Sequence, residues 1–227
     1  MDAEWFGRYA DPSLTPLELH AIQWLEGFYE LEHLLVTRRW ARCLRADASP
    51  ALLFAALVHD AERHFPGGPS STPSVPFDDP DYLFAHSLRS ADVVEEFLRS
   101  EARVSDEAFI RQVRALVLRH EIGGGTEADV LQAADSLSFL EALSWLAAEW
   151  VRSGRYSKER SVEKLRWSLE RIRVPEALVA GLPLYDHAVR ELDTTSAVDG
   201  AERRRIAGDF RLLLGLTGEP SECGVTP

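Results

Sequence analysis

Histidines and aspartates recur at five places along this chain, most of them beside apolar runs. The adjacent pair His59-Asp60 ends the apolar segment 51–58, and Asp135 lies inside another apolar run. A carboxylate on an apolar helix is costly to bury unless a cation or hydrogen-bond donors compensate its charge. Imidazoles and carboxylates that converge on a core are typical metal ligands. The pattern therefore predicts a metalloprotein, and the residues at the five places are His33, His59-Asp60, His86, His120 and Asp135.

Each of these residues also has an explanation that needs no metal. His33 could be a solvated histidine on a helix surface, and Asp135 could be a surface carboxylate. The His-Asp pair could be a chance dipeptide at a helix end. His86 and His120 could be core histidines of a protein that binds a single metal ion. Burial and mutual distance distinguish these explanations from a metal site.

Composition limits the class of protein. With 227 residues, 45% of them apolar and 27% charged, the chain is expected to form one globular domain. The net charge of −12 argues against binding to a nucleic-acid polymer, because affinity for phosphate backbones comes largely from Lys and Arg. Two cysteines are too few for a disulfide scaffold. No apolar stretch approaches the roughly 18 residues of a membrane span, and the N-terminus lacks secretory-signal features, so we expect a cytoplasmic protein with no membrane association.

The elements that must position the candidate ligands are helices. Apolar residues recur every three or four positions, and no alternating strand pattern is long enough to compete. The fold class is therefore predicted to be all-α. A stretch rich in Pro, Gly and Ser over 65–80 predicts a loop, either a lid over the site or a plain surface excursion. The predicted helices are 16–45, 50–64, 81–101, 105–121, 126–153, 157–173, 175–193 and 201–216.

The order and local contexts of these residues resemble the HD-domain superfamily. A lone histidine precedes a His-Asp dipeptide after an apolar run, and a distant aspartate follows in an Ala-Asp-x-Leu context. Ala85-His86-Ser87 and Leu118-Arg119-His120-Glu121 resemble the subset that holds two metals. The resemblance covers about residues 20–150. It implies one HD-type helical bundle over 1–196 with extra C-terminal helices, followed by a C-terminal helix and flexible tail over 197–227.

The resemblance also implies a cofactor of one or two divalent transition metal ions. Four imidazoles favour Fe, Mn, Co, Ni or Zn over Mg, which prefers all-oxygen ligands. Water bound to such ions would be acidified toward neutrality and could act as a nucleophile. The implied ligand groups share one bridging carboxylate: His33, His59, Asp60 and Asp135 for the first metal, and Asp60, His86 and His120 for the second.

Other polar residues near the His-Asp pair are candidates for further roles. Glu62 could transfer protons beside Asp60 or support a metal ligand from outside the coordination sphere. Arg63 and His64 follow by about one helical turn and could meet a phosphate at the rim. Lys158, on the helix after that of Asp135, could supply more positive charge. For each basic residue the alternative is a solvated surface side chain.

Three functions are compatible with this pattern. The leading hypothesis is hydrolysis of a small phosphoester, with a nucleotide as the favoured substrate. The alternatives are a mixed-valent di-iron oxygenase of the HD type and a non-catalytic regulatory protein that retains the metal. The segment 61–64 lacks the Glu-Asp pair of guanosine polyphosphate hydrolases, and no Gly-Tyr-Pro motif of cyclic dinucleotide hydrolases is present. The expected partner is a small phosphorylated molecule, and the acidic surface is compatible with a homodimer.

Overall fold

The structure is a computed structural model that describes residues 11–71 and 76–194. Its described residues form nine α-helices and three short helical segments and contain no strand, so the all-α prediction is confirmed. The α-helices are α2 (Pro16–Trp24), α3 (Leu31–Leu44), α4 (Pro50–Val58), α5 (Pro80–Glu96), α6 (Glu107–Val117), α7 (Thr126–Ala142), α8 (Ser144–Ser153), α9 (Lys158–Glu170) and α10 (Pro175–Thr194). The short segments are η1 (Ala61–His64), η2 (Pro69–Ser71) and η3 (Phe97–Glu101).

Several helices begin at a capping residue followed by proline. The side chains of Thr15, Ser49 and Asp79 accept hydrogen bonds from backbone amides in the first turns of α2, α4 and α5. Proline at the next position fits there because its missing N–H has no partner at a helix start. These caps fix the starts of α4 and α5, the helices that lead to His59 and carry His86.

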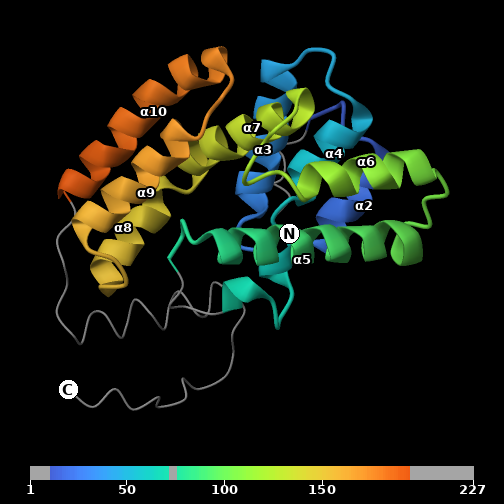
Figure 1. Cartoon of the computed structure of the whole chain (residues 1–227), viewed down its shortest axis with the longest axis horizontal. Helices are drawn as coiled ribbons and strands as arrows, with labels where there is room; N and C mark the ends of the chain where they lie inside the picture. The colour runs from blue at the N-terminus through green and yellow to red at the C-terminus, as the bar shows by residue number, and fades with distance from the viewer. Residues whose placement is uncertain (1–10, 72–75, 195–227) are drawn as a thin grey trace.

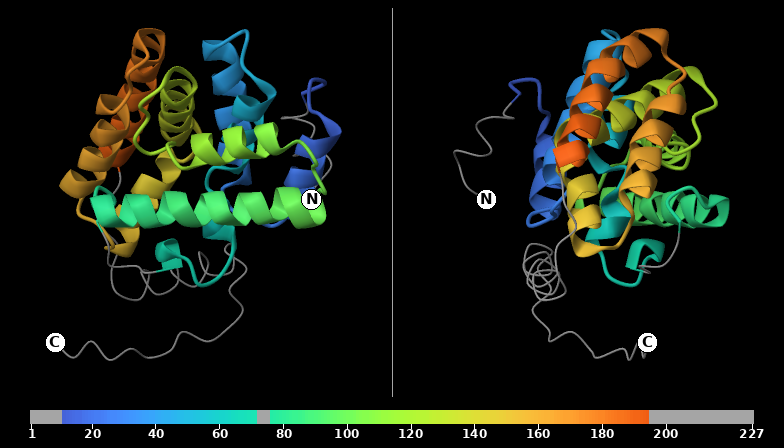
Figure 2. Two further views of the ribbon diagram at one scale, coloured as in Figure 1. Left: turned by 45° about the vertical axis from the view of Figure 1, so that its right-hand side comes forward. Right: turned by 90° about the vertical axis from the view of Figure 1, so that its left-hand side faces the viewer.

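Helix α7 is the centre of the molecule. One apolar cluster joins its residues Ala128, Leu131 and Ala134 to α2–α6. A second cluster joins its residues Leu137 and Leu140 to α8, α9 and α10. Figure 1 shows α8–α10 gathered on one side of the molecule and α2, α4 and α6 on the other. Helix α5 packs alongside α6, as the left view of Figure 2 shows.

The prediction of one long helix over 16–45 is wrong. Gly27 has a φ of +86°, a left-handed conformation that interrupts the helix between Trp24 and Leu31. The chain turns at this glycine, which brings α2 beside α3. Nε of Arg38 on α3 donates a hydrogen bond of 2.6 Å to Glu18 on α2. The break also places the start of α3 at the candidate site.

The predicted helix 126–153 is likewise two helices, because α7 ends at Ala142 and α8 begins at Ser144. The predicted helix 50–64 ends its α-helical part at Val58, which leaves the His-Asp pair in the turn before η1. The other predicted helices that lie in the described part of the chain are present, with ends that differ by a few residues. The predicted helix 201–216 and the domain boundary at 196/197 lie outside the described residues.

The loop that follows the His-Asp pair packs against Glu62. The backbone N–H and the hydroxyl of Ser70 donate hydrogen bonds of 3.0 and 2.6 Å to the two Glu62 oxygens. A Cβ at Gly68 would lie 1.9 Å from Oε1 of Glu62, so any other residue there would displace the Glu62 carboxylate. Among the described helices, none has the length and apolar character needed to cross a membrane.

Candidate metal centre

All six predicted metal ligands lie together in the interior. They come from the first turn of α3, the turn after α4, the middle of α5, the turn after α6 and the middle of α7. His59, His86 and His120 are fully buried, and His33 is only 1% exposed. Asp60 and Asp135 are each 6% exposed. The surface explanations for His33 and Asp135 are therefore wrong.

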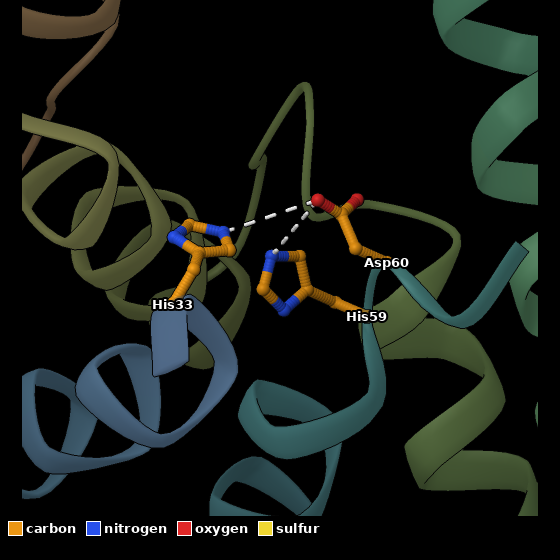
Figure 3. A group of neighbouring side chains, drawn as sticks. All are labelled: His33, His59 and Asp60. Atoms are coloured by element: carbon orange, nitrogen blue, oxygen red, sulfur yellow. Dashed lines mark ion pairs between the residues drawn. The ribbon is translucent and has the colours of Figure 1, made fainter. Parts of the chain in front are cut away.

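The first group of ligand atoms surrounds one point between α3, α4 and α7. One ligand atom each from His33, His59 and Asp60 lies within 4.8 Å of the others. Figure 3 shows both imidazoles turned toward the Asp60 carboxylate, whose Oδ2 is 3.9 Å from each Nε2. Oδ1 of Asp135 lies beside the same two imidazoles, at 3.2 Å from Nε2 of His33 and 3.4 Å from Nε2 of His59.

The second group lies on the other side of the same carboxylate. Oδ1 of Asp60 is 2.8 Å from Nε2 of His86 and 3.6 Å from Nε2 of His120. These three residues also offer ligand atoms within 4.8 Å of one another. The two oxygens of Asp60 therefore face two different pairs of imidazoles, which is the arrangement that a bridging ligand between two cations requires.

Backbone carbonyls orient two of the imidazoles. Nδ1 of His59 donates to the carbonyl of Ala56 at 3.1 Å, and Nδ1 of His120 donates to that of Val117 at 2.7 Å. These carbonyls belong to the last turns of α4 and α6, and that of Val117 also accepts a longer hydrogen bond of 3.4 Å from the His120 amide. With one proton kept on Nδ1, each imidazole can offer the lone pair of Nε2 to a metal ion in the cluster.

The residues present fit a metal ion. Nε2 of His59 and of His120 are buried, and no described group forms a hydrogen bond with either atom. Buried polar atoms almost always have a partner, so two such atoms aimed into one cluster indicate that a ligand satisfies them. An electron-pair acceptor such as a transition metal ion matches neutral imidazole nitrogens.

The charge around the cluster also favours a cation. Among the residues that the structure describes, five buried carboxylates lie in or beside it and two guanidinium groups contact them. The carboxylates are Glu30, Asp60, Glu62, Glu121 and Asp135, and the guanidinium groups are Arg63 and Arg171.

The pKa values of His33, His86 and His120 are raised by the same excess of negative charge. Burial opposes protonation of His120, but the carboxylates of Asp60 and Glu121, each with an oxygen 3.6 Å from its Nε2, outweigh burial and raise its pKa to about 10. The pKa of His86 is raised against burial by its hydrogen bonds to Asp60 and Glu62. The pKa of His33 is raised in the same way by Asp135. Surroundings that favour protons on imidazoles favour any added positive charge.

The carboxylates are held ionised. Burial opposes ionisation of Asp60, but the Arg63 guanidinium and the surrounding imidazoles lower its pKa well below the ordinary value. For Asp135, the charge of Arg171 overcomes burial and likewise lowers the pKa. Both candidate ligands are therefore ready to bind a cation at neutral pH.

Two of the additional sequence candidates contact the cluster. Glu62 is buried and receives a hydrogen bond of 2.7 Å from Nδ1 of His86, so it orients that imidazole from behind. Nε of Arg63 lies 3.2 Å from Oδ2 of Asp60, and its side chain is 24% exposed. Arg63 is thus the basic residue of this segment that both touches the cluster and reaches toward solvent.

The other two candidates make contacts elsewhere. The imidazole of His64 packs against the rings of Phe28 and Phe65, and burial lowers its pKa. Nζ of Lys158 pairs with Asp193 at 3.0 Å, at the far end of α10. The structure therefore does not bring His64 or Lys158 into contact with the ligands.

Sequence reasoning missed Arg171 and assigned no role to Glu121. Arg171, at the end of α9, donates hydrogen bonds to Oδ2 of Asp135, to Oε2 of Glu121 and to the hydroxyl of Ser136. Oε1 of Glu121 lies 3.6 Å from Nε2 of His120. Glu121 directly follows the candidate ligand His120, and this position could have drawn attention to it. No comparable sequence feature marks Arg171, which lies outside residues 20–150.

Comparison of the chain with protein-family models, with curated proteins and with solved structures gives no match. The features of this chain that point to a function are the buried His/Asp groups, which could hold metal ions, and the charges that surround them.

Proposed function

We propose that this protein belongs to the HD-domain superfamily and hydrolyses a small phosphoester, with a nucleotide as the favoured substrate. The cluster would use one or two divalent transition metal ions for this reaction. The observation that carries the proposal is the position of Asp60, whose two oxygens face separate histidine pairs. Paired cations that share a carboxylate suit phosphoryl chemistry, because both the attacking and the departing oxygen carry negative charge.

The donor set supports transition metals over magnesium. Four imidazoles and two carboxylates match Fe, Mn, Co, Ni or Zn, whereas Mg²⁺ takes oxygen ligands. His33, His59, Asp60 and Asp135 would hold the first ion, and Asp60, His86 and His120 the second. The ions would supply polarisation of a phosphoryl oxygen and a water molecule of lowered pKa.

The protein's own groups would orient the ligands and receive the substrate. The carbonyls of Ala56 and Val117 hold two imidazoles with Nε2 inward, and Glu62 does the same for His86. Both oxygens of Glu62 are occupied by His86 and Ser70, which supports a positioning role rather than proton transfer. Arg63, partly exposed beside Asp60, is placed to contact a phosphate oxygen at the edge of the cluster.

The test is hydrolysis by protein of known metal content. Metal-free protein reloaded with Mn²⁺, Co²⁺ or Fe²⁺ is expected to hydrolyse members of a panel of nucleotides and simple phosphomonoesters. Asp60→Asn is expected to abolish both metal retention and turnover. Asp92→Asn serves as a control, because Asp92 is an exposed α5 carboxylate that pairs with Arg114 at 2.7 Å.

Full activity of the Asp60→Asn variant, or of wild-type protein stripped of metal, would contradict this proposal. Iron-dependent oxygen uptake with no hydrolysis would also contradict it, and would favour the di-iron oxygenase instead. A protein that retains its metal but turns over nothing in either screen would favour the regulatory alternative.

A further inference from the structure

One face of α9 carries three cations and one aromatic ring, and rings from other segments lie against the cations. Arg160, Lys164, Trp167 and Arg171 are spaced by four, three and four residues, so they follow one side of the helix. The guanidinium of Arg160 lies 4.1 Å from the ring centroid of Phe77. At the other end, the guanidinium of Arg171 lies 4.5 Å from the ring centroid of Trp167.

Lys164 lies in the middle of this row, among three rings. Its Nζ is 4.2 Å from the centroid of Trp167, 4.9 Å from that of Phe139 and 5.3 Å from that of Phe77. Cations within about 6 Å of an aromatic centroid are attracted by the ring face. The rings therefore hold the half-buried ammonium group in one place.

The two arginines of the row form ion pairs with carboxylates, whereas Lys164 forms none with a described residue and feels the charges of Glu121 and Asp135 only at longer range. Arg160 binds Asp78 at 2.6 Å and Glu163 at 2.8 Å. Arg171 binds Asp135 and Glu121. Within the described part of the chain, no carboxylate pairs with Lys164.

Lys164 is also close to the candidate metal centre. Its ammonium group and the Arg171 guanidinium lie against the same indole, that of Trp167. Arg171 in turn contacts Asp135, one of the candidate ligands. The Trp167 ring therefore connects the ammonium group of Lys164 to Arg171, which contacts the cluster.

We infer that Lys164 binds an oxyanion of the substrate, separate from the phosphoryl group that reacts at the cluster. This inference rests on the proposed function and narrows it to substrates that carry a second anionic group, such as a further phosphate. A compact ammonium charge is a common phosphate partner. Partial burial strengthens its attraction for an anion, because solvent screens the charge less there.

The first experiment probes the site without any turnover. Metal-loaded, full-length protein is acetylated at its lysines in the presence and absence of inorganic pyrophosphate, and modification of each lysine is measured by mass spectrometry. Pyrophosphate is expected to protect Lys164 but not Lys158, which lies on the same helix and pairs with Asp193. Equal protection of both lysines, or of neither, would overturn the inference.

The second experiment separates binding from chemistry. Lys164→Met is expected to raise KM for substrates with a second phosphate by roughly 10- to 100-fold, the range for losing a hydrogen bond to a charged group. Its kcat and its KM for p-nitrophenyl phosphate should change little, and Lys158→Met should match wild type. Equal KM changes for both substrate types would overturn the inference. If wild-type protein hydrolyses nothing, the proposed function fails, whereas the acetylation result still decides whether Lys164 binds anions.

Discussion

Arg171 donates a hydrogen bond to Oδ2 of Asp135, the carboxylate whose Oδ1 lies 3.2 Å from Nε2 of His33. The guanidinium therefore fixes the orientation of a candidate ligand from the side opposite the cluster. Through its second hydrogen bond, Arg171 also holds Glu121 beside His120. The end of α9, which lies outside residues 20–150, thus contributes to both groups of candidate ligands.

Arg171→Met should strongly destabilise metal-free protein. The variant leaves two buried carboxylates without their counter-charge, and removing one partner of a buried pair costs about 3–5 kcal/mol. Added Mn²⁺ should recover part of the loss, because bound cations supply positive charge. Urea denaturation with and without metal measures both effects.

Arg173→Met is the matched control for that measurement. The Arg173 side chain is 54% exposed and lies 3.3 Å from Asp129. Exposed pairs contribute about 0–1 kcal/mol, so the control should unfold close to wild type with or without metal. Similar losses in both variants would show that Arg171 has no special role at the cluster.

Metal content should distinguish the bridging ligand from a ligand of one group. Wild-type protein prepared without added metal should carry about two equivalents. His86→Gln should retain about one, because His86 belongs only to the second group. Asp60→Asn should lose most of both ions, since Asp60 contributes to both groups.

Elemental analysis of the three purified proteins gives these values directly, and circular dichroism checks that each variant is folded. One equivalent in wild type, unchanged in His86→Gln, would show that the second group of ligands holds no metal. Retention of both ions by Asp60→Asn would show that the carboxylate does not bridge them.

Local pattern and family resemblance were enough to predict the buried His/Asp groups but not the residues that support them. His59-Asp60 could be recognised because the pair ends an apolar helix, and Asp135 because apolar neighbours bury it. The helix break at Gly27 was missed because a single glycine inside an apolar repeat is weak evidence for a turn. Arg171 was missed because its contact depends on how α9 packs against α7, which no local pattern specifies.

Glu62→Ala should weaken metal binding at the second group of ligands. Glu62 accepts the Nδ1 proton of His86, and losing such an outer partner typically lowers metal affinity by about 10- to 100-fold. Ser70→Ala is the control, because it removes a hydrogen bond to Glu62 and leaves the bond to His86 intact. Competition with a chromophoric chelator measures the affinity of each variant. Equal affinities of wild type and Glu62→Ala would show that His86 needs no support from Glu62.

The stability contributed by Lys164 should depend on pH in the alkaline range. Burial, with help from the charge of Arg171, lowers its pKa from 10.5 to about 8 in the folded protein. Between these values the unfolded chain binds more protons than the folded chain, so unfolding free energy rises with pH. Wild type should therefore gain stability relative to Lys164→Met as pH rises from about 8 to about 10.5. The gain should disappear as pH falls through 8.

Denaturant unfolding at several pH values measures this difference, and groups common to both proteins cancel. Lys164→Arg is the control, because arginine stays charged throughout the interval and should show no such gain relative to Lys164→Met. A difference between wild type and Lys164→Met that stays constant across the interval would contradict the lowered pKa. It would mean that attraction to Phe77, Phe139 and Trp167 keeps the amine charged, because contact with ring faces favours the cation whereas burial opposes it.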